Sequence, residues 1–97
     1  MGYCYYLIRE DNRTCFELGK HVGDWAEYLG DWRSPIVLLP EHEETLTLVL
    51  AQLMPDVPTH YPPFVAKSII NWSEGQPFYF AGEETREDYE LTGSRYR

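Results

Sequence analysis

Cysteine, basic residues and long apolar runs are scarce in this sequence. It holds two cysteines, and eight Lys and Arg residues against 16 Asp and Glu. No apolar stretch approaches the length of about 18 residues that a membrane-spanning helix needs, and the start lacks the basic segment and apolar run of a secretory leader. We therefore expect a cytoplasmic protein that does not enter a membrane. Because its basic residues are few and scattered, we expect no nucleic-acid binding.

The two cysteines do not have the pattern of a metal site or a disulfide. Cys4 and Cys15 are eleven residues apart, without a second close pair or a histidine at ligand spacing, so we predict no zinc site and no cofactor. In the hairpin predicted below, Cys4 faces Gly19, too far from Cys15 for a disulfide. Both are expected to be free thiols.

Motifs of common catalytic sites are also missing. The sequence has no phosphate-binding glycine loop, dinucleotide fingerprint, zinc-protease helix or nucleophile elbow. Glu43 and Glu44 lie beside His42, but adjacent residues on a helix point apart, which disfavours joint acid–base catalysis. Glutamates are also favoured in a first helical turn because they interact with the positive end of the helix dipole. His21 and His60 fall in expected loops. We predict a non-catalytic protein, with a small enzyme built around His42 or His60 as an alternative.

The residues that are present indicate one folded domain over 1–97. Apolar residues make up 43% of the chain and aromatic residues 15%, as in a folded domain. With 97 residues the chain is long enough for one hydrophobic core but too short for a second. Two alternatives remain for residues 82–97. They form a mobile acidic tail, or Tyr89, Leu91 and Tyr96 pack back and make a last edge strand.

Negative charge is concentrated in the middle of the chain. The net charge is -8, and residues 24–60 contribute seven acidic residues against a single arginine. Such a field repels nucleic acids and anionic lipids and attracts basic proteins. A basic protein is therefore the predicted partner.

Residues 3–18 are predicted to form a β-hairpin. Both arms are rich in aromatic and β-branched side chains, and a polar turn separates them. The register pairs Leu7 with Phe16 and Tyr5 with Leu18. The opposite face is mixed, so we expect another element to cover part of it. The predicted core face consists of Tyr3, Tyr5, Leu7, Phe16 and Leu18.

Prolines and glycines divide the rest of the chain into short elements. The apolar run at 35–40 predicts a buried strand, and 77–81 another. Apolar residues at helical spacing predict helices at about 41–54 and 63–73, the second ending at Glu74-Gly75. We predict an α+β fold, in which a small antiparallel or mixed sheet, made of the hairpin and one or two short strands, is packed on one face by two to three helices.

The tripeptide Gly-Asp-Trp occurs twice, at 23–25 and 30–32. If this segment is a helix capped by Asp24, aromatic residues lie on one face beside a stripe of acids. One interpretation is an interface for a basic partner, because aromatic anchors carry binding energy and charges select the partner. The other is a core helix with a solvated flank, and Gly30 could end it after one turn. The predicted partner-binding residues are Asp24, Trp25, Glu27, Tyr28, Asp31 and Trp32.

Size, charge and the repeated tripeptide favour a non-catalytic acidic binding protein. Its most concrete form is an immunity-type inhibitor that covers the positive cleft of a basic bacterial toxin such as a nuclease. The alternative from another class is a homo-oligomeric structural or assembly module. Eight Tyr, three Trp and four Phe exceed the needs of a small core, so exposed rings could bury a homodimer surface.

Overall fold

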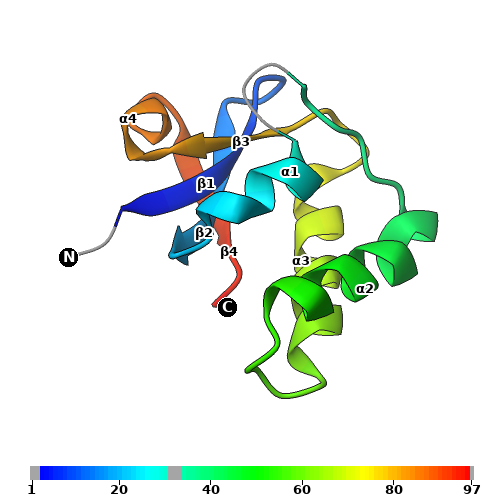
Figure 1. Cartoon of the computed structure of the whole chain (residues 1–97). Helices are drawn as coiled ribbons and strands as arrows, with labels where there is room; N and C mark the ends of the chain where they lie inside the picture. The colour runs from blue at the N-terminus through cyan, green and yellow to red at the C-terminus, as the bar shows by residue number, and fades with distance from the viewer. Residues whose placement is uncertain (1–2, 31–33, 97) are drawn as a thin grey trace.

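A four-stranded mixed sheet is the frame of the fold (Figure 1). The computed structural model describes residues 3–30 and 34–96. The strand order is β3, β1, β2, β4, with β1 antiparallel to both β2 and β3, and β4 parallel to β2. The predicted α+β class with a small mixed sheet is confirmed. The strands are β1 (Cys4–Arg9), β2 (Thr14–Lys20), β3 (Tyr79–Gly82) and β4 (Glu90–Ser94).

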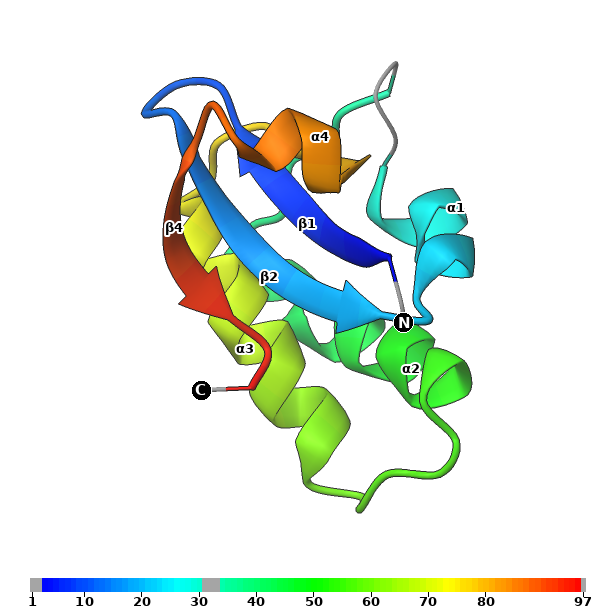
Figure 2. The ribbon, with the colours of Figure 1, turned by 90° about the vertical axis from the view of Figure 1, so that its left-hand side faces the viewer.

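Helices cover the sheet unequally on its two faces. Figure 2 shows α2 and α3 behind the sheet, and the short helix α4 in front of it, in the connection from β3 to β4. The 3-10 turn η1 leads into α1, and η2 leads into α2. The helices are α1 (Ala26–Leu29), α2 (Glu43–Leu53), α3 (Tyr61–Ser73) and α4 (Glu83–Arg86), and the 3-10 turns are η1 (Gly23–Trp25) and η2 (Pro40–His42).

The two long helices lie where the apolar spacing predicted them. Leu46 and Leu50 of α2 face the core, and so do Val65 and Ile69 of α3. α3 begins two residues earlier than the predicted 63–73. It ends at Glu74, which adopts the left-handed conformation (φ 52°, ψ 33°) that commonly terminates a helix.

The hairpin forms, but its register differs from the prediction in one part. Leu7 pairs with Phe16 as expected, and both are buried. The predicted pairing of Tyr5 with Leu18 is wrong, because a bulge shifts the register and Tyr5 faces Gly19 instead. The extra residue increases the local bend of β2, and Gly19 has a positive φ of 93°. Leu18 is still fully buried in the core.

A smaller apolar cluster occupies the other face of the sheet. It consists of Ile8, Cys15, Tyr79 and Ala81, with Tyr89 and Leu91 packed against it from the connection and from β4. The expectation that another element partly covers this face is confirmed. Cys4 faces Lys20 because of the bulge, and both cysteines are free thiols as predicted.

The predicted buried strand at residues 35–40 is wrong. Ile36 forms an isolated bridge with Phe78, through backbone hydrogen bonds of 2.8 and 3.0 Å, while Val37 and Leu39 are 46% and 40% exposed. The prolines at both ends of the run have no N–H to donate, so the segment cannot extend a hydrogen-bonded ladder. It runs as an extended linker from the edge of β3 to α2.

The C-terminal segment takes the second of its two predicted forms. Residues 90–94 add β4 as an edge strand beside β2. Trp72 of α3 holds this strand through a hydrogen bond from its indole Nε1 to Thr92 Oγ1 of 3.1 Å. The strand therefore contributes both backbone pairing and a helix contact to the fold.

Candidate functional site

The first Gly-Asp-Trp tripeptide forms the 3-10 turn η1 rather than the start of a long helix. The predicted N-cap at Asp24 is wrong, because α1 begins at Ala26 and no side-chain cap bond forms. α1 ends after one turn at Gly30, where φ is 79°. A Cβ at Gly30 would lie 2.7 Å from the carbonyl oxygen of Ser34, so the chain needs glycine at this reversal. Asp31 and Trp32 lie outside the described residues.

Trp25 is a core residue. It is 2% exposed, and the guanidinium of Arg95 lies 5.3 Å from the centroid of its ring. A single helix predicts Trp25 and Tyr28 on one face, but Trp25 lies in the 3-10 turn η1 and is buried, whereas Tyr28 lies in α1 and is exposed. Asp24, Glu27 and Tyr28 are exposed, and Tyr28 retains 48% of its accessible surface. Among the described residues, these three are the exposed members of the predicted set.

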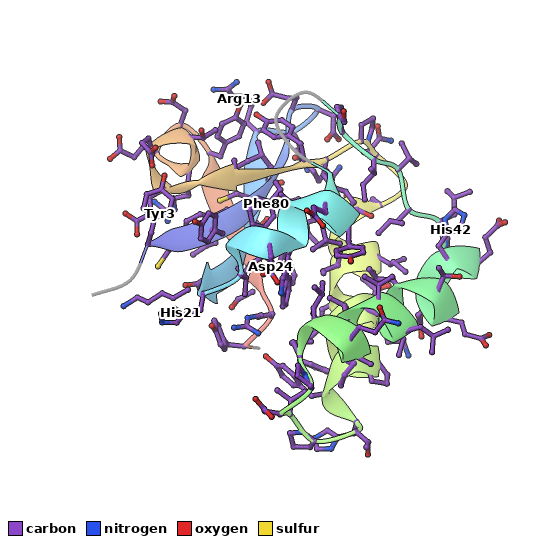
Figure 3. The ribbon with its side chains drawn as sticks, viewed as in Figure 1. Tyr3, Arg13, His21, Asp24, His42 and Phe80 are labelled. Carbon is purple, nitrogen blue, oxygen red and sulfur yellow. The ribbon has the colours of Figure 1, made fainter. Side chains whose placement is uncertain are left out.

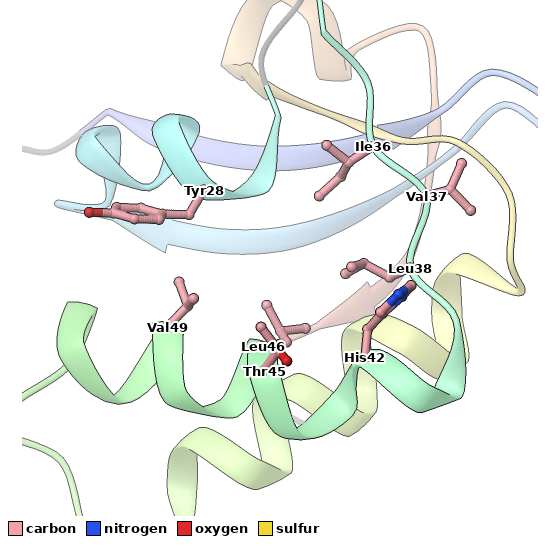
Figure 4. A pocket seen from close by; sticks show the side chains of 8 residues that line it. All are labelled: Tyr28, Ile36, Val37, Leu38, His42, Thr45, Leu46 and Val49. Atoms are coloured by element: carbon pink, nitrogen blue, oxygen red, sulfur yellow. The ribbon is translucent and has the colours of Figure 1, made fainter.

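Tyr28 borders a groove between α1, the linker and α2 (Figure 4). The volume of the groove is about 310 Å³, which is sufficient for one large side chain of a partner. Aliphatic side chains form most of its wall, so burial there favours an apolar group. The lining residues are Tyr28, Ile36, Val37, Leu38, His42, Thr45, Leu46 and Val49.

His42 closes one end of this groove and is held by two hydrogen bonds with Leu39. The backbone N–H of Leu39 donates to His42 Nδ1 at 2.9 Å, and the N–H of His42 donates to the Leu39 carbonyl, also at 2.9 Å. Since Nδ1 accepts a hydrogen bond, the neutral ring carries its proton on Nε2. Figure 4 shows the ring beside Leu38, where the linker enters η2. His42 thus fixes the end of the linker.

The elements on both sides of the groove carry exposed carboxylates, although none of the described acidic residues lines it. The lining residues fall within positions 24–60, which hold seven acidic residues and one arginine. Asp24 and Glu27 are exposed on the α1 side, and Glu41 and Glu44 are exposed at the start of α2. Within the described residues, none of these four carboxylates forms an ion pair. An apolar surface bordered by free carboxylates is complementary to an apolar side chain with cationic neighbours.

The tyrosines with shifted pKa values lie elsewhere, on the opposite face of the sheet. Burial raises the pKa of Tyr79 far above its ordinary value, and its hydrogen bond with Tyr89 acts in the same direction. Burial, followed by the hydrogen bond to Glu10, raises the pKa of Tyr89. Arg13 lies 4.5 Å from the centroid of the Tyr89 ring. These contacts hold the connection from β3 to β4 against the hairpin.

The sequence did not reveal the linker and His42 as parts of the groove. The continuous apolar run between two prolines predicts a buried strand, although the same run also fits an extended segment with one side packed. Thr45 and Val49 give a second signal, because they lie on α2 beside the core positions Leu46 and Leu50. The sequence alone does not show that this face of α2 is incompletely covered, because that depends on how the helix packs against the rest of the fold.

Two further classes of site are absent from the described part of the chain. Over residues 3–30 and 34–96 there is no cluster of three His, Cys, Asp or Glu side chains able to hold a metal ion. In the same ranges, no helix has the length and apolar character needed to span a membrane. Of the histidines considered for catalysis, His42 lines the groove, whereas His60 is exposed just before α3.

Comparison with known proteins assigns no family. No family model matches the chain, and neither the curated proteins nor the solved structures gave a match. The groove and the carboxylates beside it are therefore the features of the chain that bear on its function.

Proposed function

We propose that this protein is a non-catalytic binding protein whose groove receives an apolar side chain of a basic protein partner. The observation that carries the proposal is an apolar groove flanked by two elements that carry exposed carboxylates, which form no ion pair within the described residues. Tyr28 adds an aromatic ring that is already half exposed at the mouth. Aromatic residues and complementary charges are typical of protein interfaces.

The apolar contact and the charges contribute differently to binding. Burying one Leu or Phe side chain is worth about 1.5–3 kcal/mol, whereas an exposed ion pair is worth roughly 0.2–1 kcal/mol. The groove therefore supplies the larger part of the affinity at this site. The carboxylates act mainly on the rate of association and on the choice of partner, and their effect is screened by salt.

The most concrete form of the proposal is an immunity-type inhibitor of a basic bacterial toxin such as a nuclease. A nuclease needs a positive cleft to hold phosphates. A small protein with a net charge of -8 and carboxylates on both sides of an apolar groove is complementary to such a cleft. Its binding would exclude the nucleic acid through both volume and charge.

Affinity capture with matched charge-reversal variants tests this function. Glu27→Lys alters the α1 wall, while Glu87→Lys makes the same charge change at the end of α4, on the other face of the sheet (Figure 2). We expect the wild type and Glu87→Lys to capture the same basic protein, and Glu27→Lys to lose it. The captured protein is then purified and titrated directly, and a captured nuclease is expected to lose activity at equimolar inhibitor.

Two results would contradict the proposal. One is binding that is equally strong in both variants and insensitive to salt. The other is a stable homodimer, seen by light scattering at several concentrations, that captures no basic protein, which would favour the assembly module instead.

A further inference from the structure

A second cavity lies at the end of the sheet where β2 and β4 finish. Because these neighbouring strands run parallel, Lys20 and His21 at the end of one strand meet Arg95 at the end of the other. Figure 3 shows His21 at this end of the sheet. The cavity has a volume of about 280 Å³, and its wall also includes the ring of Trp25.

Arg95 lacks an anionic partner among the described residues. Its Nε donates to the Leu18 carbonyl, one Nη donates to the Tyr96 hydroxyl at 2.8 Å, and the other contacts the Met54 sulfur at 3.4 Å. A guanidinium has five N–H groups, so two remain after these three contacts, and a thioether is a weak acceptor. The rings of Trp25 and Tyr96 lie 5.3 and 4.7 Å from the guanidinium carbon. These contacts hold the guanidinium in place, and no carboxylate of residues 3–30 or 34–96 neutralises it.

The balance of charge in this cavity is opposite to that of the whole protein. Lys20 and Arg95 contribute two positive charges, and Asp56 on the loop between α2 and α3 contributes one negative charge. With His21 neutral, the cavity remains cationic in a chain whose net charge is -8. Two of only eight basic residues converge here.

We propose that this cavity binds an oxyanion, a carboxylate or a phosphate group. The two remaining N–H groups of Arg95 are the principal contact, because a guanidinium matches the paired oxygens of both anions. Lys20 supplies the second positive charge. Pro55 and Val57, which are not buried, provide an apolar surface for the part of the ligand that carries the anion. This site is independent of the partner-binding groove.

Nuclear magnetic resonance titrations distinguish a built site from general ionic effects. The wild-type protein is titrated separately with inorganic phosphate and with acetate, while sodium chloride keeps the ionic strength constant. We expect saturable shifts of the Arg95 Nε–H, the Trp25 indole N–H and the amides of Lys20 and His21. The anion with the lower dissociation constant identifies the preferred chemistry.

Charge variants decide whether these residues form the site. We expect Lys20→Gln to weaken anion binding about fivefold, because it removes an attractive charge. Asp56→Asn removes a repulsive charge and should strengthen binding about twofold. Lys67→Gln, a matched change on exposed α3 surface, is expected to leave the affinity unchanged. Arg95→Lys removes the paired donors and should weaken binding about tenfold.

The proposal fails if the shifts do not saturate, or if Lys20→Gln and Lys67→Gln change the affinity equally. It also fails if Asp56→Asn leaves the affinity unaltered. Should Arg95→Lys prevent folding, the Lys20 and Asp56 variants still decide, because both side chains lie outside the buried core.

Discussion

The backbone N–H of Leu39 donates to Nδ1 of His42 at 2.9 Å, so the imidazole acts as a side-chain acceptor where the linker turns into α2. This hydrogen bond closes η2 and determines the direction from which the preceding residues enter the turn. Val37 and Leu38, which line the groove, belong to that segment. The shape of the groove therefore depends on a hydrogen bond in a turn as well as on packing.

Replacing His42 tests this dependence. His42→Ala removes the acceptor and is expected to lower the free energy of unfolding by about 1 kcal/mol, the usual cost of a lost cap. Asparagine carries an acceptor oxygen near the position of Nδ1, so His42→Asn should lose less than half as much. Urea unfolding measures both changes, and amide exchange reports the bond itself. Equal exchange of the Leu39 amide in all three proteins would show that the hydrogen bond does not hold the turn.

Arg9 is expected to be the most costly charged residue to replace. It is 3% exposed, and its guanidinium binds Asp11, Glu74 and the carbonyl of Trp72. Arg9→Met preserves much of the volume but leaves the carbonyl without its donor, at a cost of about 2–4 kcal/mol. The control Arg13→Met removes an exposed cation over the Tyr89 ring and should cost less than about 1 kcal/mol. Similar losses for the two variants in urea unfolding would contradict this ranking.

Acid should weaken the fold partly through Asp11. The hydrogen bond from Arg9 lowers the pKa of this carboxyl below its ordinary value of 3.8. Its contribution is present above the ordinary pKa and is lost as the pH falls through the lowered one. The difference in free energy of unfolding between wild type and Asp11→Asn should thus be constant above about pH 5 and should shrink toward zero at lower pH. A difference that persists undiminished in strong acid would disprove this linkage.

Alkali should weaken the fold through the tyrosines on the opposite face. The pKa of Tyr79 is raised above the ordinary value of 10.0, so the unfolded chain releases this proton first. The contribution of Tyr79 to stability is therefore complete below about pH 10 and is lost as the pH rises through the raised pKa. Tyr79→Phe removes one such group, and its alkaline unfolding midpoint, followed by circular dichroism, should move upward. The exposed Tyr28→Phe is the matched control, and an equal rise there would argue against a specific role of Tyr79.

Local patterns in the sequence account for much of this fold. The spacing of Leu46 and Leu50 specifies α2, and the turn after Arg9 specifies the hairpin. The bulge that shifts the pairing of Tyr5 leaves no periodic signal in the sequence, and Gly19 beside it lies against a residue that is distant in the chain. A Cβ at Gly19 would meet the Tyr96 hydroxyl at 2.1 Å, so the glycine accommodates a ring from beyond the last strand.

The candidate site was predictable only in part, for a similar reason. The sequence predicts Glu27 and Tyr28 as neighbours that combine charge and an aromatic ring, and the structure shows both as exposed. Their groove also needs Gly30 to reverse the chain and Ile36 to bridge to Phe78, 42 residues further on. Such long-range pairing leaves no periodic signal in a single sequence.

The most direct test of the binding groove uses three short peptides and nuclear magnetic resonance. The first is Lys-Lys-Trp-Lys-Lys, and the controls replace its tryptophan by alanine or its lysines by glutamates. We expect only the first peptide to shift the methyl signals of Val37 and Val49 and the ring signals of Tyr28, with an affinity that falls as salt is added. Equal shifts with the glutamate peptide, or shifts by the first peptide only outside the groove, would contradict the proposed recognition of basic partners.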